Sequence, residues 1–137
     1  MTSKITYLGN LRTEAVHQLS GNKIITDAPP DNNGKGESFS PTDLAATALG
    51  SCMMTIMGIA ARDRGIDMDG ATAEVTKRMA ADPHRRIAGI GVKIFMPVGK
   101  KYTARERKLL ETAAHACPVG RSLSANLEEV VEIVWPG

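Results

Sequence analysis

The sequence predicts an α+β fold, and three features of its pattern support this prediction. A run without charged residues extends from Leu44 to Ala61 and has the length of a buried helix. A second, amphipathic helical pattern lies nearer the C-terminus, and alternating strand-like segments lie before, between and after the two helices. Because the order is β-β-α-β-β-α-α-β, we expect antiparallel strands on one side of a central helix. With 137 residues in all, the chain is expected to form a single domain, residues 1–137.

The N-terminal segment, residues 4–28, is expected to be a β-hairpin. The stretch KITYLGNLRTEAVHQL is strand-like, SGNK is typical of a turn, and IITDA forms the returning strand. Alternation places Arg12 and Glu14 on the same face of the first strand. Residues 29–41, PPDNNGKGESFSP, are rich in proline, glycine and asparagine and predict a loop long enough to be functional.

A long helix is predicted from Pro41 to about Arg64. Ser40 can cap its N-terminus, because Pro41 suits the first helical position and Asp43 completes a capping box. Gly65 is expected to end the helix. The uncharged part of this helix approaches the length of a membrane span, but much of it is Ala, Gly, Ser and Thr, and anchoring residues do not flank both ends. We therefore interpret it as a core helix and expect no membrane partner.

The rest of the chain is predicted to contain a second hairpin, two further helices and a last strand. GATAEVTKRMAAD and RRIAGIGVKIFMPV are the two strands of the hairpin, and ADPHR is its turn. Thr103 and Glu106 form a second capping box that starts an amphipathic helix, which we expect to end near Cys117. Pro118 then begins a short helix with Cys117 at its cap position, and EEVVEIVWPG closes the chain as a strand.

Composition and charge argue against several classes of function. The formal net charge of +2 comes from interspersed charged residues rather than a basic block, so no nucleic-acid partner is expected. Aromatic residues make up only 4% and do not alternate with basic ones, so no stacking platform is indicated. The first ten residues, MTSKITYLGN, lack the apolar segment of a secretory signal, and we therefore expect a cytoplasmic protein.

The two cysteines, Cys52 and Cys117, are the candidate reactive groups. An isolated cysteine on an apolar helix, as at Cys52, is most often a buried and unreactive side chain. Cys117 lies directly before Pro118 at a predicted helix N-terminus, where the backbone dipole favours an anion and can lower a thiol pKa. The chain has no CxxC motif, and a structural disulfide is disfavoured in a cytoplasmic protein. A peroxidatic thiol with a distant resolving thiol remains, and it needs a cation beside the first sulfur.

A metal site is not indicated either. The three histidines, His17, His84 and His115, do not stand at the spacing of zinc ligands relative to each other or to the cysteines. We expect neither a metal nor a cofactor.

Two segments carry a family resemblance. SPTDLAATALGSC, which ends at Cys52, and CPVGRSL, which begins at Cys117, together resemble the OsmC/Ohr family, the osmotically inducible and organic hydroperoxide resistance proteins. The start SPT is typical of the general OsmC-like branch, and the resemblance extends over essentially the whole chain. It implies the OsmC-like α+β fold in an intertwined homodimer, with two central helices and active sites at the subunit interface.

The resemblance also implies a function. The protein would be a thiol-dependent peroxidase for organic peroxides, with hydrogen peroxide as a second candidate substrate. Cys52 would attack the O–O bond, and Cys117 would resolve the resulting sulfenic acid into a disulfide. A dithiol, in some members a lipoylated protein, would then reduce that disulfide. Arg12 looks like the family arginine that holds the thiolate.

The sequence departs from the peroxidase members at one position. Those members place a glutamate just after the helix-starting proline, where it clamps the arginine, and this sequence has Thr42. Three residues are candidates to orient the arginine instead: Glu14, on the strand face of Arg12, Glu37, in the loop, and Thr42 itself. Two further hypotheses stay open: a dimer of the same fold that binds a small apolar or thiol-bearing ligand without turnover, and a structural protein with inert thiols.

Overall fold

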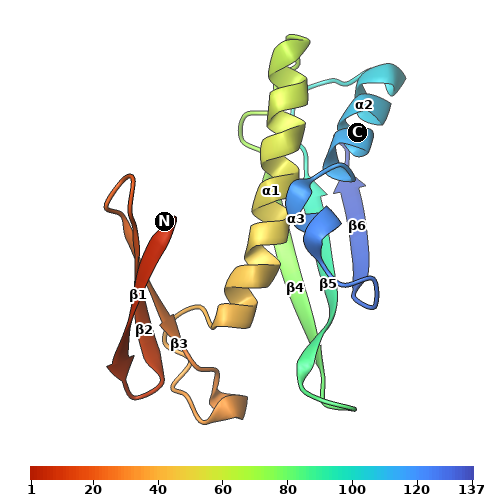
Figure 1. Cartoon of the computed structure of the whole chain (residues 1–137). Coiled ribbons are helices and arrows are strands. Elements are labelled where there is room, and N and C mark those ends of the chain that lie inside the picture. Colours follow the sequence, from red (N-terminus) through yellow and green to blue (C-terminus); the bar gives the residue numbers. More distant parts are fainter. The chain divides into compact units, whose positions relative to one another are not determined.

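The computed structural model describes residues 1–137, and the chain divides into two compact units between Ala45 and Ala46. Each unit contains one three-stranded sheet. The mixed α+β class predicted from the sequence is confirmed (Figure 1). That the whole chain forms a single domain stays a prediction.

The first unit, residues 1–45, is built on an antiparallel sheet with the strand order β1-β2-β3. Its strands are β1 (Ser3–Gly9), β2 (Arg12–His17) and β3 (Lys23–Asp27). A single turn of 3-10 helix, η1 (Pro30–Asn32), lies in the loop that follows. The buried residues of this unit are Thr26, Asp27 and Ser40, so no apolar side chain of the first unit is buried.

The sequence predicted a hairpin where the structure has three strands. The chain turns at Gly9, Asn10 and Leu11, which all have positive φ angles, so the first predicted strand is in fact β1 and β2. Glycine and asparagine adopt this left-handed conformation more readily than other residues. The Gly-Asn pair was therefore a hairpin signal inside a stretch that otherwise alternates like one strand.

The long helix α1 (Pro41–Asp63) begins at the predicted capping box. The backbone N–H of Ser40 donates to the Asp43 carboxylate at 3.0 Å, and the backbone N–H of Asp43 donates to the Ser40 hydroxyl at 3.0 Å. Gly65, with a φ of 67°, follows the end of the helix, as predicted.

By length and composition alone, α1 could cross a membrane. One such helix is weak evidence, because the core helix of a soluble protein passes the same test. The buried residues of α1 form a stripe with helical spacing: Ala46, Leu49, Gly50, Met53, Met57 and Ala61. A one-sided stripe of this kind is the pattern of a helix that packs against a core.

The sheet of the second unit has the strand order β4-β5-β6. Its strands are β4 (Thr72–Ala80), β5 (Arg86–Phe95) and β6 (Glu128–Val134). β4 and β5 form the predicted antiparallel hairpin, but β6 runs parallel to β5, whereas the sequence predicted antiparallel strands. The two helices between β5 and β6 return the chain to the end of the sheet at which β5 begins. β6 therefore runs in the same direction as β5, which gives the parallel pairing.

The two crossover helices are α2 (Ala104–Ala114) and α3 (Pro118–Ser122). The predicted capping box of Thr103 and Glu106 is present at the start of α2. α2 ends at Ala114, earlier than predicted, and α3 starts with Cys117 at its cap position, as predicted.

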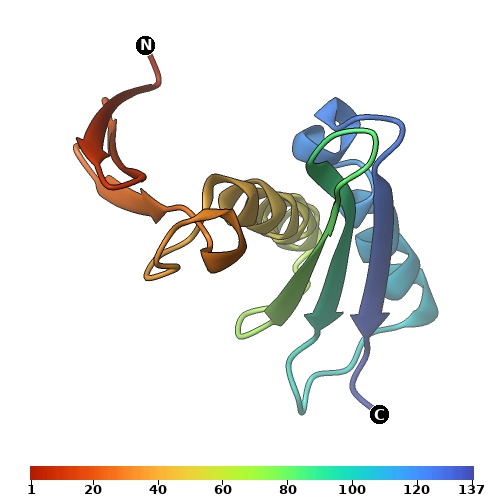
Figure 2. The same cartoon turned by 90° about the horizontal axis from the view of Figure 1, so that it is seen from below.

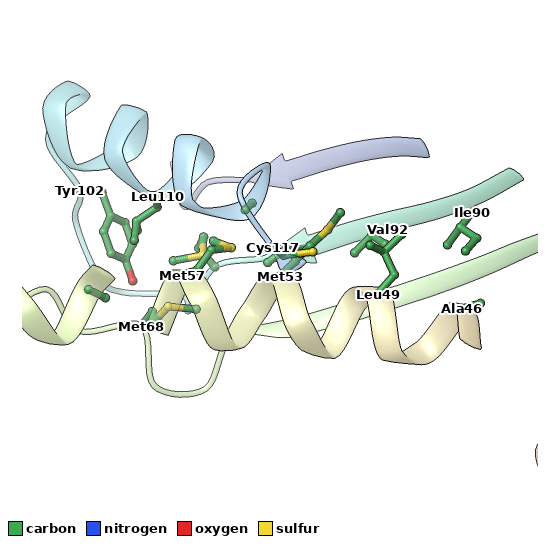
Figure 3. Close-up of a cluster of buried hydrophobic side chains, with 14 residues drawn as sticks. Ala46, Leu49, Met53, Met57, Met68, Ile90, Val92, Tyr102, Leu110 and Cys117 are labelled. Atoms are coloured by element: carbon green, nitrogen blue, oxygen red, sulfur yellow. The ribbon is translucent and has the colours of Figure 1, made fainter. Parts of the chain in front are cut away.

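The core of the second unit lies between its helices and one face of its sheet (Figures 2 and 3). α1 contributes its buried stripe, and β5 contributes Ile90, Val92 and Ile94. A Cβ atom at Gly50 would lie 2.7 Å from Cγ2 of Val75 on β4. Glycine at this position therefore allows α1 to approach the sheet closely, and this close packing sets the position of the cysteine two residues later.

Candidate active site

Cys52 lies on α1 at the edge of the buried stripe, one position before Met53. Its side chain is half-buried and packs against the core cluster of the second unit. The apolar helix alone favoured an inert core cysteine. The structure instead leaves this thiol partly accessible, as a group that reacts with a small molecule must be.

Cys117 is the more deeply buried of the two thiols, with 2% of its surface exposed, and it belongs to the core cluster drawn in Figure 3. Its Sγ accepts a hydrogen bond of 3.2 Å from the backbone N–H of Gly120 and so caps α3. Both cysteines are free thiols in this structure.

Burial raises the pKa of the Cys117 thiol, and the Gly120 N–H opposes this only in part. The neighbouring Cys52 side chain and the charge on Glu129 raise this pKa further. The expectation that the helix N-terminus lowers the pKa of Cys117 was therefore wrong. α3 spans only Pro118–Ser122, and the loss of hydration outweighs its single N–H donor.

Gly120 shapes the surroundings of Cys117, and sequence analysis did not single it out. A Cβ atom at Gly120 would lie 3.1 Å from Glu129 Oε1, 3.3 Å from Cys117 Sγ and 3.4 Å from Leu49 Cδ1. Any larger residue at this position would thus be in tight contact with the Cys117 thiol, the Glu129 carboxylate and Leu49 of α1. The signal was present in the motif CPVG, where a glycine stands three positions after the cysteine.

Arg12 is the first residue of β2 in the first unit and makes two ion pairs. Its Nη2 lies 2.6 Å from Glu37 Oε2 and 3.4 Å from Asp27 Oδ2. The hydrogen bond with Asp27 contributes most to raising the pKa of Arg12. The guanidinium group is thus held by one carboxylate from the neighbouring strand and one from the loop.

The other predicted partners of Arg12 have different contacts. Glu14 forms an ion pair with Lys23, at 3.9 Å. Thr42 places its hydroxyl 3.1 Å from that of Ser40, at the start of α1. Of the three predicted arginine-orienting residues, the structure thus pairs Glu37 with Arg12.

Asp27 is the residue that sequence analysis missed. In the antiparallel pair β2–β3 its Cα is the direct partner of that of Arg12. The turn around Gly21 is a signal for this pairing, but the alternation of residues in the two strands does not fix their register. Asp27 can therefore be recognised as the partner of Arg12 only when the register of the two strands is known.

No group of three or more His, Cys, Asp and Glu side chains is arranged to hold a metal ion. The chemistry that these residues can perform is that of the two adjacent thiols in the second unit and of the paired guanidinium group in the first.

Comparison with known proteins identifies the family. Residues 34–131 match the family model described as OsmC-like protein. The chain belongs to the OsmC-like family. A crystal structure from Psychrobacter arcticus 273-4 is 51% identical to this OsmC-like chain, with 98% of this chain and 96% of the other covered and a TM-score of 0.92. That protein is described as an osmotic stress induced and detoxification response protein.

More distant structures share the fold of this OsmC-like chain. The organic hydroperoxide resistance protein OsmC of Legionella pneumophila is 15% identical, with 97% and 96% of the two chains covered and a TM-score of 0.75. The organic hydroperoxide resistance protein OhrB of Bacillus subtilis is 18% identical, with 98% of each chain covered and a TM-score of 0.68. No curated protein matches the sequence significantly. The resemblance to the OsmC/Ohr family that the cysteine motifs indicated is confirmed.

Proposed function

We propose that this OsmC-like chain is a thiol-dependent peroxidase that reduces organic hydroperoxides, with hydrogen peroxide as a second candidate substrate. The observation that carries the proposal is the pair of thiols: Cys52 is half-buried, and the buried Cys117 beside it has a raised pKa. The difference in burial supports different roles for the two sulfurs, because the thiol that attacks the peroxide must be accessible to it.

In the first step, the Cys52 thiolate attacks the O–O bond of the hydroperoxide. The S–O bond forms as the O–O bond breaks, which leaves a Cys52 sulfenic acid and an alkoxide that takes a proton to become an alcohol. The apolar side chains packed around Cys52 favour a peroxide with an organic substituent.

In the second step, Cys117 attacks the sulfur of the Cys52 sulfenic acid. The S–S bond forms, and the hydroxyl group leaves as water with the proton of the Cys117 thiol. The packing of both cysteines in one core cluster supports this role for Cys117, because it keeps the two thiols in the same part of the second unit. An external dithiol, with a lipoylated protein as the candidate partner, then reduces the disulfide and restores both thiols.

Arg12 is proposed to stabilise the Cys52 thiolate. A guanidinium group stays charged at all relevant pH values and offsets the desolvation that raises a buried thiol pKa. Its two carboxylate partners hold the group in a fixed orientation. Arg12 lies in the first unit and Cys52 in the second, so this role depends on an assembled protein.

That assembly is proposed to be a homodimer. The sheet of the first unit has no buried apolar side chain, and it exposes several large ones by more than a third of their surface: Ile5, Tyr7, Leu8, Leu11, Ile24 and Ile25. Exposed apolar surface on this scale is typical of a protein interface. A second copy of the chain would cover it, as in the intertwined dimer that the family resemblance implies.

Peroxide consumption tests the enzymatic proposal directly. The wild-type protein, with a dithiol as reductant, should consume cumene hydroperoxide at a rate that Cys52→Ser abolishes. Cys117→Ser is the matched control: it keeps the attacking thiol, so without the dithiol it should consume about one peroxide per Cys52. A wild-type rate no higher than that of Cys52→Ser, on both organic and hydrogen peroxide, would rule the peroxidase out.

Subunit mixing tests the homodimer and the role of Arg12 together. Cys52→Ser and Arg12→Ala should each be inactive or nearly so. If Arg12 of one subunit serves Cys52 of the other, a mixture of the two variants after subunit exchange should regain part of the wild-type rate. A monomeric mass in light scattering at micromolar concentration would contradict the homodimer.

The alternative function is a dimer that binds a small apolar or thiol-bearing ligand without turnover. Thr42 favours it, because this position carries no carboxylate to orient Arg12. Intact mass after mild peroxide treatment separates the two functions: the peroxidase should lose two hydrogens as Cys52 and Cys117 form a disulfide, whereas a binding protein should keep its mass.

A further inference from the structure

Asp27 has no exposed surface and ends the strand opposite Arg12. A buried carboxylate needs charge or hydrogen-bond partners to stay ionised. Here the pKa of Asp27 is lowered, first by the backbone N–H of Glu37 and then by Arg12. Asp27 is therefore an ionised group inside the first unit, with its negative charge directed at the candidate arginine.

One oxygen of Asp27 joins the strand to the loop. Asp27 Oδ2 accepts from Arg12 Nη2 at 3.4 Å and from the backbone N–H of Glu37 at 2.9 Å. The backbone N–H of Asp27 donates to the carbonyl oxygen of Phe39 at 3.1 Å. Asp27 thus fixes the arginine and also the segment that carries its second carboxylate.

The loop is shaped to return to this point. A Cβ atom at Gly34 would lie 1.7 Å from the carbonyl oxygen of Ala28, so only glycine fits there. The backbone N–H of Gly36 donates to the same carbonyl oxygen at 3.1 Å. The loop therefore folds back on the end of β3 and brings Glu37 to Asp27 and Arg12.

The second oxygen of Asp27, Oδ1, is buried and has no hydrogen-bond donor among the residues of the chain. An unsatisfied buried acceptor lowers the stability of the folded protein. Stability alone therefore does not explain a carboxylate at this position. Buried polar groups without a partner are commonly found at functional sites. The feature favours a role for Asp27 beyond holding the sheet together.

Asp27 and Glu37 are not equivalent partners of Arg12. The contact with Glu37 is shorter, at 2.6 Å, but the Glu37 side chain is 58% exposed, and exposed ion pairs are strongly screened by water. The Asp27 side chain is fully buried and is held by a strand rather than a loop. Asp27 therefore constrains the position of the guanidinium group more strongly than Glu37.

We propose that Asp27 is the positioning residue for Arg12: through its buried ion pair and its hydrogen bond to the loop, it sets the orientation of the guanidinium group to which the proposed function gives the stabilisation of the Cys52 thiolate. Glu37 is a secondary partner. This inference rests on the proposed function, since it assigns Asp27 a role in that same chemistry.

Enzyme kinetics provide the first test. Asp27→Asn keeps the shape but removes the charge, and it should lower kcat/KM about 10- to 100-fold. Glu37→Gln should lower it less than about fivefold, because its ion pair is exposed. Glu74→Gln, which removes an exposed carboxylate from β4, is the control for loss of a negative charge. Circular dichroism and the unfolding transition confirm that each variant is folded.

A double variant distinguishes positioning from general structural support. If Asp27 acts through Arg12, then Arg12→Ala combined with Asp27→Asn should be no slower than Arg12→Ala alone. Asp27→Glu keeps the charge and should retain more activity than Asp27→Asn. Additive losses in the double variant, or an Asp27→Asn rate within twofold of wild type, would overturn the proposal.

A thiol-labelling experiment keeps this inference separate from the peroxidase proposal. The rate at which iodoacetamide alkylates Cys52 at neutral pH reports its thiolate fraction without any peroxide. Arg12→Ala and Asp27→Asn should both slow this labelling, and Glu37→Gln should slow it less. If the wild type labels in this pattern but consumes no peroxide, only the peroxidase fails. If Asp27→Asn labels as fast as the wild type, the role of Asp27 fails, whatever the turnover.

Discussion

Arg12 and Asp27 stand directly opposite each other in the antiparallel pair β2–β3, and their side chains form an ion pair of 3.4 Å across the two strands. One backbone register thus provides both the cation and its buried counter-charge. The pairing makes the charge on Asp27 a contributor to folding as well as to the candidate site, and this has a measurable pH dependence.

Stability at acid pH should report the ionised state of Asp27. Its pKa is lowered in the folded protein by the Glu37 N–H and Arg12, with a further contribution from the charge on Lys35. The stabilisation is therefore present above the ordinary aspartate pKa of about 3.9 and is lost as the pH falls through the lower folded value. Urea unfolding between about pH 5 and pH 2.5 should show a shallower loss of stability for Asp27→Asn than for the wild type. Equal slopes would contradict this assignment.

The alkylation of Cys117 should need a higher pH than that of an ordinary thiol. Burial raises its pKa first, and the neighbouring Cys52 side chain raises it further. In Cys52→Ala the contribution of Cys52 is absent, so the pH profile of Cys117 labelling should move to lower pH. Peptide mass spectrometry after iodoacetamide treatment over a pH series measures both profiles. An unchanged profile would mean that Cys52 does not contribute to the pKa of Cys117.

Two glycines of α1 should respond in opposite ways to alanine. Gly50→Ala places a Cβ atom 2.7 Å from the stiff side chain of Val75, and overpacking of this kind costs about 1–3 kcal/mol. Gly58 has no atom within 4 Å of an added Cβ atom, so Gly58→Ala should gain up to about 1 kcal/mol from helix propensity. Denaturant unfolding of the two variants gives the comparison. A loss of stability in Gly58→Ala would show that an element outside this unit packs there.

The capping box of α2 should contribute measurably to stability. Thr103→Ala removes the hydroxyl group that accepts from the Glu106 N–H and should cost about 1 kcal/mol of unfolding free energy. Thr103→Ser should restore most of the loss. Thr112→Ala is the matched control in the same helix, because the hydroxyl group of Thr112 is bonded only to the preceding turn and is not a cap. Equal losses in Thr103→Ala and Thr112→Ala would argue against the cap.

Local chemistry made the helix starts predictable. The capping boxes at Ser40 and Thr103, and Cys117 at the cap of α3, depend on residues within three positions of each other, and all three lie where the sequence placed them. The family could also be predicted from the sequence, because each of the two cysteine motifs is a continuous stretch of residues that is typical of the family.

The errors concern features that depend on residues distant in the sequence. The parallel pairing of β6 with β5 depends on where the crossover through α2 and α3 leaves the chain. The raised pKa of Cys117 depends on burial by elements other than its own helix. Asp27 became visible as the partner of Arg12 only once the register of β2 and β3 was known. The two strands within residues 3–17 are the exception, since the Gly-Asn turn that separates them is local.

The absence of buried apolar side chains in the first unit has a consequence for dilute solutions. Residues 1–45 carry Arg12 but no hydrophobic interior, whereas the thiol pair belongs to a unit with its own core. If a second copy supplies the missing cover, the order around Arg12 depends on protein concentration, and that around Cys52 and Cys117 does not. Dilution would then disturb the surroundings of Arg12 first, while the two thiols would keep theirs.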